Sequence, residues 1–391
     1  MDGLMSEFVD VLIIGGGPVG AALARSLADA PLSVMVLEAK SSPAADPRVL
    51  AISCGSKLSL ERIRAWSAVE HATPISTIHV SQKGGFGRAI LTAEESGVAA
   101  LGYVAGYHEI HSALISGLDP EICIEGACAC EIDLSGDFGA VDFDYQGKRR
   151  QISARLVVMA DGGKLVEHVK GIEQHQHEYG QWAIIGQVRA EKPHLNTAFE
   201  RFTPEGPVAL LPYGEGFSLV WTARPQAAQT LLALEKDEFL EKLHEHFGDR
   251  LGKFVEVDPL SGFPLVLRYS RPIVAEHLAL IGNAAQTLHP VSGQGLNLGL
   301  RDARALAREI MATPIDDIGS SRMLSNYSSR REIDRKSGIH FTDSLIRIFS
   351  NEIPALRAGR GIALAALDCA PPVRKWFSRK MMFGIGSQSI L

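Results

Sequence analysis

The sequence predicts an α/β protein: a Rossmann-like nucleotide-binding domain, an inserted antiparallel-sheet substrate domain and C-terminal helices. Three observations support this. The chain opens with a strand, a glycine-rich turn, a helix and a second strand, which is a β-α-β unit. Strand-like segments separated by Gly and Pro fill the middle. Helical periodicity dominates from residue 295 onward, and 391 residues suffice for two domains.

The elements follow from local patterns. The β-branched run 9–14 is typical of a buried parallel strand, Pro18 of the first turn of a helix, and the apolar run 32–38 of a second strand. A β-rich tract over 179–222 predicts the inserted sheet, and 226–247 has helical spacing. Further strands are expected at 75–81, 122–124, 138–145, 152–160 and 278–281, and further helices at 295–311 and 321–348.

These elements divide the chain into interleaved parts, because the strand near residue 278 and the helix after it return to the nucleotide-binding domain. The predicted division is 1–70, 101–175 and 270–340 for the nucleotide-binding domain, 71–100 and 176–269 for the inserted sheet domain, and 341–391 for a C-terminal helical tail.

Composition excludes several classes of protein. The formal net charge is −6 with no dominant basic patch, so we expect no nucleic-acid partner. Five cysteines without a CxxC pair predict neither a disulfide framework nor a metal site. The acidic N-terminus lacks the features of a signal peptide, and we find no apolar run of about 18 residues. We therefore expect a cytoplasmic protein, with peripheral contact to the inner face of the cytoplasmic membrane as an open alternative.

The most informative local motif is G-x-G-x-x-G, at Gly15, Gly17 and Gly20. Such glycines permit a tight turn, a close approach of pyrophosphate and close packing of helix on strand. Glu38 ends the second strand, where an acid binds the ribose hydroxyls of a dinucleotide. The motif predicts FAD or NAD. Two further segments, 157–163 and 280–299, place a buried strand before a glycine-rich loop, and a helix N-terminus near Gly295 can stabilise an anionic reduced flavin.

With these segments the chain resembles the flavin-dependent aromatic hydroxylases of the para-hydroxybenzoate hydroxylase superfamily. Within it, the chain is most similar to the ubiquinone-biosynthesis hydroxylases, and among them to the 2-octaprenyl-6-methoxyphenol hydroxylase branch. The resemblance rests on residues 46–53, 100–103 and 200–207, and above all on 282–302. It implies an FAD-dependent monooxygenase without a separate nicotinamide domain, using NAD(P)H and O₂ to hydroxylate a polyprenylated methoxyphenol.

The resemblance also implies the cofactor-binding residues. It assigns Gly15, Gly17, Gly20 and Glu38 to the ADP half of FAD, Arg48, Asp161, Gly162, Gly282 and Asn283 to the rest of the cofactor, and Pro290, Gly293, Gly295, Leu296 and Asn297 to the flavin ring. Two departures from the family pattern predict weaker cofactor use. Asn283 replaces a common aspartate, and Asp161-Gly162 continues as Gly163-Lys164.

The flavin carries the chemistry, so the resemblance requires no catalytic side chain of its own. His289 and Tyr213 are candidates for substrate contact, each with a structural role as the alternative. Two other functions stay open at this point. A sheet arginine such as Arg189, Arg201 or Arg224 would favour a soluble aromatic acid as substrate. The departures near Asn283 would suit a flavin-poor scaffold subunit in a multi-enzyme quinone assembly.

The tail mixes basic and aromatic residues. From residue 340 it holds seven Lys and Arg against three Asp and Glu, with Trp376, Phe377 and Phe383 interleaved. Such a helix can lie on anionic lipid, where the tail of a polyprenyl substrate resides. The equal alternative is that the helix covers the flavin domain and turns its charges to water.

Overall fold

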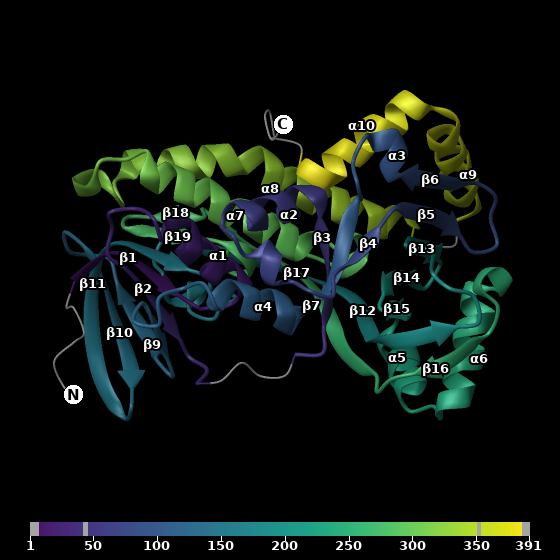
Figure 1. Cartoon of the computed structure of the whole chain (residues 1–391), viewed down its shortest axis with the longest axis horizontal. Helices are drawn as coiled ribbons and strands as arrows, with labels where there is room; N and C mark the ends of the chain where they lie inside the picture. The colour runs from purple at the N-terminus through teal and green to yellow at the C-terminus, as the bar shows by residue number, and fades with distance from the viewer. Residues whose placement is uncertain (1–7, 42–45, 350–352, 385–391) are drawn as a thin grey trace.

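The computed structural model describes residues 8–41, 46–349 and 353–384. Within these ranges the chain forms two large sheets and one three-stranded sheet (Figure 1). The helices α7 and α8 run along one long side of the molecule, and α5 and α6 lie beyond the second sheet. The helices are α1 Pro18–Leu27, α2 Cys54–Arg62, α3 Ala93–Ser96, α4 Tyr107–Ile115, α5 Pro225–Leu232, α6 Lys236–Phe247, α7 Gln294–Met311, α8 Ser321–Phe349, α9 Pro354–Cys369 and α10 Pro371–Phe383.

The first large sheet is built around the opening strand. Its order is β18-β19-β11-β1-β2-β8, with β10 and β9 continuing from β11. β1 lies between β11 and β2 and pairs in parallel with both, which brings their carboxyl ends to one edge. The strands are β1 Phe8–Ile14, β2 Val34–Glu38, β8 Cys123–Glu125, β9 Cys128–Asp133, β10 Gly139–Tyr145, β11 Lys148–Met159, β18 Val274–Ala275 and β19 Leu278–Leu280. The Rossmann-like part of the predicted fold is confirmed.

The second large sheet is the inserted one. Its order is β20-β17-β12-β15-β14-β13-β5-β6, and β16 pairs with β12. Every pair is antiparallel except β13 with β5, because β5 comes from the segment before the insertion. Its strands are β5 Thr77–Gln82, β6 Arg88–Thr92, β12 Glu173–Ala190, β13 Thr197–Thr203, β14 Gly206–Tyr213, β15 Gly216–Ala223, β16 Phe254–Val257, β17 Ser261–Arg271 and β20 Gln286–Thr287. These pairings support the division into domains, which stays our proposal.

The two faces of the second sheet have different neighbours. Leu219, Trp221 and Leu210 pack against Phe239 and Leu243 of α6 in a core of their own. Alternate residues on the same strands turn the opposite way, as strand geometry requires, and face the first sheet. The small sheet of β3 Val49–Ser53, β7 Gly102–Gly106 and β4 Thr73–Ile75 completes the described strands.

Three elements differ from expectation. The helix expected over 226–247 is broken into α5 and α6 at residues 233–235. β17 and β3 were not predicted, because neither sequence alternates cleanly between apolar and polar residues. Helix α8 agrees with the helix predicted over 321–348 and crosses the tail boundary proposed at residue 341, so that boundary stays a proposal.

Helices α9 and α10 lie together over the β5–β6 hairpin and α3 (Figure 1). Met382 is buried, and Phe377 and Phe383 pack with it against Leu91 and Leu101. The neighbouring Trp376 is 60% exposed. The tail therefore covers the fold with one face and leaves apolar side chains on the other.

Candidate functional site

A cavity of about 1480 Å³ lies where the two large sheets face each other. The carboxyl ends of β1, β2 and β11 border it on one side, and strands of the second sheet border it on the other. This is where open parallel sheets bind ligands. The volume exceeds that of ordinary small-molecule sites, about 300–1,000 Å³. It has room for a dinucleotide and a substrate.

The glycine-rich turn forms one end of this cavity. Gly15 has φ +104°, and a Cβ there would meet Ala160 at 2.7 Å. A Cβ on Gly20 would stand 2.0 Å from the carbonyl oxygen of Gly15, so only glycine lets α1 approach β1 this closely. Gly17 caps α1 without a side-chain hydrogen bond and lies on the cavity wall, whereas Gly20 lies behind it. The free N–H groups of α1 thus face a site suited to pyrophosphate.

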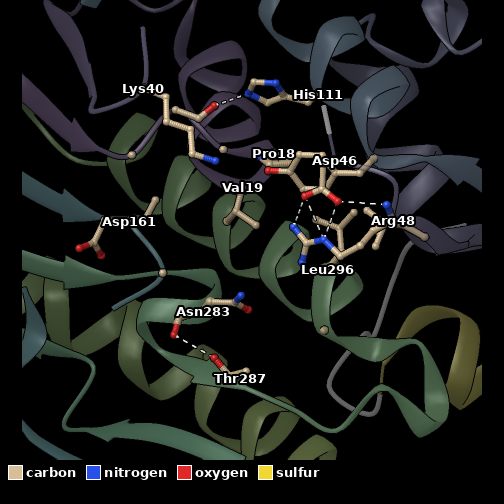
Figure 2. Close-up of a pocket in the computed structure, with 18 of the residues that line it drawn as sticks. Pro18, Val19, Lys40, Asp46, Arg48, His111, Asp161, Asn283, Thr287 and Leu296 are labelled. Atoms are coloured by element: carbon tan, nitrogen blue, oxygen red, sulfur yellow. Dashed lines mark hydrogen bonds and ion pairs between the residues drawn. The ribbon is translucent and has the colours of Figure 1, made fainter. Parts of the chain in front are cut away.

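Two side chains hold this turn in place. The Glu38 carboxylate accepts hydrogen bonds from the backbone N–H of Gly16 at 2.7 Å and of Lys40 at 2.9 Å. His111 of α4 lies within hydrogen-bond distance of the Gly16 carbonyl, 2.8 Å from Nε2, and must donate because a carbonyl only accepts. Figure 2 shows His111 and Lys40 on either side of the turn. Glu38 lines the cavity as predicted, whereas His111 was not foreseen because it follows no motif.

Arg48 lies opposite the turn, in the loop before β3. Its guanidinium pairs with Asp46 at 2.6 Å (Figure 2). It also lies 4.8 Å from the ring centroid of Tyr107. The hydrogen bond with Asp46 raises the pKa of Arg48, so the side chain is always charged. Burial raises the pKa of Tyr107 and keeps its hydroxyl neutral. Tyr107 is a cavity residue that the sequence did not single out.

The Asp161-Gly162 segment follows β11 and enters the cavity wall. The Asp161 carboxylate accepts hydrogen bonds from the N–H of Gly163 at 2.9 Å and of Leu165 at 3.2 Å, which makes a tight turn. Gly162 and Gly163 have φ of +83° and +88°, so this turn needs both glycines. The exposed Lys164 also lines the cavity. Gly163, which departs from the family pattern, is therefore needed for the shape of this turn.

The Gly282-Asn283 loop is fixed from behind. Gly282 packs on Val19 of α1, and its N–H donates to the Asp302 carboxylate at 3.1 Å. Asp302 is fully buried, accepts from Gln286 Nε2 at 2.6 Å and pairs with Arg331 of α8 at 2.7 Å. Asn283 is exposed on the cavity wall, where its main-chain carbonyl accepts from Thr287 (Figure 2).

The next turn carries the residues assigned to the flavin ring. Pro290, Gly293, Gly295 and Leu296 all line the cavity. A Cβ on Gly295 would meet nothing within 4 Å, and α7 starts there without a side-chain cap. The N-terminus of α7 is thus open toward the cavity and can stabilise negative charge. Together with α1, it gives the site two helix N-termini.

Three predicted site residues have other contacts. Asn297 does not line the cavity: it is 2% exposed, accepts from the Ser53 N–H at 2.8 Å and donates to the carbonyls of Ala51 and Gly293. Asn297 thus links α7 to β3 and does not border the space proposed for the flavin ring. His289 is 1% exposed, and its Nδ1 accepts from Val291 N–H at 3.1 Å.

Burial lowers the pKa of His289 to about 3, so it stays neutral and structural. Tyr213 packs with Ile75, Val104 and Ala198 and is not among the cavity residues. Neither side chain is among the described residues that line the cavity, and both rings pack inside the fold, which favours the structural alternative for His289 and Tyr213.

The second sheet supplies an apolar wall. Ile185, Leu211 and Val220 project from β12, β14 and β15, and Val266 and Phe263 from β17. Arg268 is the one arginine of this sheet among the lining residues, and its Nε is buried without a hydrogen-bond partner in the described part of the chain. Arg189 and Arg224 are exposed, and Arg201 lines a second cavity on the other face.

These features fit FAD. The space before Gly17 is free, since a Cβ there would meet only the Tyr107 hydroxyl at 3.8 Å. Two uncapped helix N-termini border the cavity and suit anionic groups, and Glu38 ends the second strand, the position that binds ribose hydroxyls in dinucleotide-binding folds. We propose that the cavity residues named above hold FAD, with Gly20, Gly282 and Asn297 shaping the site from behind.

Comparisons with known proteins agree with an FAD-binding protein. The FAD binding domain family model matches residues 8–336. The chain is 34% identical to the ubiquinone hydroxylase UbiL of Rhodospirillum rubrum, over 97% of this chain and 91% of that protein. It is 31% identical to the 3-demethoxyubiquinol 3-hydroxylase of Escherichia coli, over 95% and 98%. The p-nitrophenol 4-monooxygenase PnpA of Pseudomonas putida has the same fold, with a TM-score of 0.79, 20% identity and coverage of 97% and 100%.

Fold and site thus define a flavin-dependent aromatic monooxygenase with FAD as cofactor and NAD(P)H as co-substrate. More narrowly, the chain belongs to the ubiquinone-biosynthesis FAD-dependent hydroxylase family. This confirms the family predicted from residues 282–302. The 2-octaprenyl-6-methoxyphenol branch stays a prediction.

Proposed function

We propose that this protein hydroxylates the ring of a polyprenylated methoxyphenol on the path to ubiquinone. The apolar wall of the second sheet carries this proposal. Ile185, Leu211, Val220 and Val266 offer a long apolar surface beside the cofactor site, as a prenyl chain requires. The relatives named for ubiquinone hydroxylation align with this chain over 91% and 98% of their own length.

The chain's own residues bind, orient and exclude water. When bound, FAD supplies the electron transfer and oxygen activation that no side chain here provides. Glu38 and the α1 N-terminus would hold its ADP half, and the open start of α7 would favour negative charge at the ring. The apolar side chains opposite would keep water from the reacting ring and from activated oxygen.

The test uses purified protein reconstituted with FAD and mixed anaerobically with NADPH. We expect the flavin absorbance to bleach faster when the polyprenyl phenol is present, and product with one added oxygen atom to form after admission of O₂. Unchanged phenol, in a preparation that binds FAD stoichiometrically, would contradict the substrate assignment. A preparation that takes up no FAD would instead support the scaffold alternative.

A second candidate substrate is a soluble aromatic acid. Arg268 favours it, because an arginine with a free Nε on the cavity wall can pair with a carboxylate. The Arg268→Gln variant separates the two. It should abolish turnover of a hydroxybenzoate-type acid and leave turnover of a neutral prenyl phenol within a few-fold of the wild type.

We also propose peripheral membrane contact through α9 and α10, and with it a place in a multi-enzyme quinone assembly at the membrane. None of the described helices is long and apolar enough to span a bilayer. Ile362 is 61% exposed and Trp376 60% exposed, and exposed Lys375 and Arg379 accompany them. Apolar side chains flanked by cations suit an anionic lipid surface.

Flotation with anionic vesicles tests this contact. Ile362→Ser with Trp376→Ser should reduce bound protein about tenfold or more, since each buried apolar side chain contributes about 1.5–3 kcal/mol. The control is Val255→Ser on β16, an exposed apolar residue of the second sheet. Equal flotation of wild type, double variant and control would remove the membrane proposal.

A further inference from the structure

A second cavity, of about 440 Å³, lies on the α6 side of the second sheet. The large cavity borders the opposite face of this sheet, through residues such as Leu211 and Val220. The second cavity therefore plays no part in holding FAD or the aromatic ring. It lies at the far edge of the sheet, beside the β5–β6 hairpin.

Three arginines converge on this cavity. The strand register places Ser81 of β5 between Arg88 of β6 and Arg201 of β13, so all three side chains share one face. Arg250, which follows α6, supplies the third guanidinium. No Asp or Glu is among the described residues that line the cavity. Like charges that line one cavity repel one another unless an anion binds between them.

A neutral histidine holds one of these cations in place. Arg250 donates a hydrogen bond to His79 Nε2 at 2.9 Å, and since arginine cannot accept, this nitrogen carries no proton. His79 is 4% exposed, and burial and the nearby Arg250 lower its pKa to about 4. Arg201 has a buried Nε without a hydrogen-bond partner in the described part of the chain. Burial and Arg250 lower the pKa of Arg201, as expected for an uncompensated cation.

The backbone of the β5–β6 hairpin also borders this cavity. The hairpin over residues 83–87 is glycine-rich, and Gly84 and Gly87 have φ of +62° and +86°. Such turns direct successive N–H groups to one side and form anion-binding concavities. Both glycines and Gly85 line the cavity. The nearby carboxylates are otherwise engaged: Asp249 lies 3.0 Å from His244, and Glu245 2.9 Å from Lys242.

We propose that this cavity is a binding site for a phosphate group, held by Arg88, Arg201, Arg250 and the Gly84–Gly87 turn. The three guanidiniums come from three different elements, and a planar carboxylate has only two oxygens to share among them. A tetrahedral phosphate offers an oxygen to each. The phosphate group can belong to a soluble phosphoester or to a lipid headgroup, because the exposed Phe86 and helix α9 adjoin the same hairpin.

Calorimetry with inorganic phosphate at constant ionic strength measures the site directly. We expect wild-type protein to bind phosphate. The Arg88→Gln, Arg201→Gln double variant should bind it about tenfold or more weakly, because each guanidinium contributes a charged hydrogen bond to the anion. The control is Arg189→Gln on the same sheet, whose partner is the exposed Glu256. Without phosphate the double variant should melt no lower than wild type, because repulsion between the cations is removed. This separates a lost site from a lost fold.

Vesicles of phosphatidylcholine with and without phosphatidic acid identify the source of the phosphate. If the double variant loses the extra flotation that phosphatidic acid gives, the site binds a lipid headgroup. If flotation is unchanged but phosphate affinity falls, it binds a soluble phosphoester. The Ile362→Ser, Trp376→Ser variant should keep its phosphate affinity, which separates this site from the apolar contact of the tail. Equal phosphate affinity and flotation in wild type and double variant would overturn the proposal.

Discussion

Asp302→Asn should loosen the cofactor loop while leaving the rest of the fold intact. The Asp302 carboxylate has no solvent exposure and makes three contacts: with Gly282 N–H, Gln286 Nε2 and Arg331 Nε. An asparagine there can still accept from the two loop donors through its oxygen. Its amide nitrogen then faces the Arg331 guanidinium, which is another donor.

The cost follows from the burial of Arg331, whose side chain is 7% exposed. Burial opposes its charge, but Asp302 and Asp334 outweigh this and raise the pKa of Arg331. Breaking a buried pair by removing one partner costs about 3–5 kcal/mol. Asp334 remains 2.8 Å from Arg331, so we expect the lower end, about 3 kcal/mol. For 391 residues the unfolding entropy is about 0.8 kcal/mol/K, so the melting temperature should fall by about 4 °C.

Differential scanning calorimetry and FAD titration measure the two effects. The affinity for FAD should fall about tenfold or more, because Asn283 and Thr287 of this loop line the cofactor cavity. Glu332→Gln on α8 is the control: its partner Lys336 is half exposed, and such pairs contribute about 0–1 kcal/mol. If Asp302→Asn melts within 1 °C of the control and binds FAD like the wild type, the loop does not depend on this carboxylate and the reasoning fails.

Three further predictions concern single side chains. Gly17→Ala should fold normally but bind FAD at least tenfold more weakly, because its Cβ would enter the space proposed for the pyrophosphate. Gly20→Ala should instead lower the melting temperature, because its Cβ would clash with Gly15. Calorimetry and FAD titration distinguish the two effects. Burial raises the pKa of Glu200 to about 8, so the folded state favours the protonated acid. The stability that this protonated acid contributes is lost as the pH rises through 8. Glu200→Gln should flatten that loss in melting curves recorded across pH. Asn297→Ala should release α7 from β3 and cost about 1–3 kcal/mol in chemical denaturation, with no direct loss of a flavin contact.

Much of the nucleotide-binding part could be predicted from the sequence because its signals are local. A buried strand, three spaced glycines and an acid at the next strand end lie within residues 9–38, and each occupies the expected element. The same holds for Pro290, Gly293 and Gly295, where a helix start follows a glycine-rich loop. Site features that depend on backbone conformation, such as glycine turns and helix starts, can be recognised from short stretches of sequence.

The rest depended on contacts between distant segments. Tyr107 and His111 reach the site because α4 lies against the glycine turn, and nothing near them in the sequence marks this. His289 and Asn297 resemble site residues because they stand inside the most specific motif. Their side chains turn into the core, where one caps a short helix and the other ties a helix to a strand. A motif fixes where the chain runs, and packing decides which of its side chains face the ligand.

The position of the buried charges explains how a neutral residue can stand at position 283. The geometry of the loop is set from behind, by Asp302 on Gly282 and by Arg335 on Gln286 at 2.5 Å. Within the described residues, Asn283 contributes its main-chain carbonyl to that loop, as acceptor for the Thr287 hydroxyl. Replacing an aspartate there removes one charge from the cavity wall but none of the contacts that shape it. The loss of that acid can therefore change how FAD is held without taking away the site, and for that reason the structure favours an enzyme over a flavin-poor scaffold.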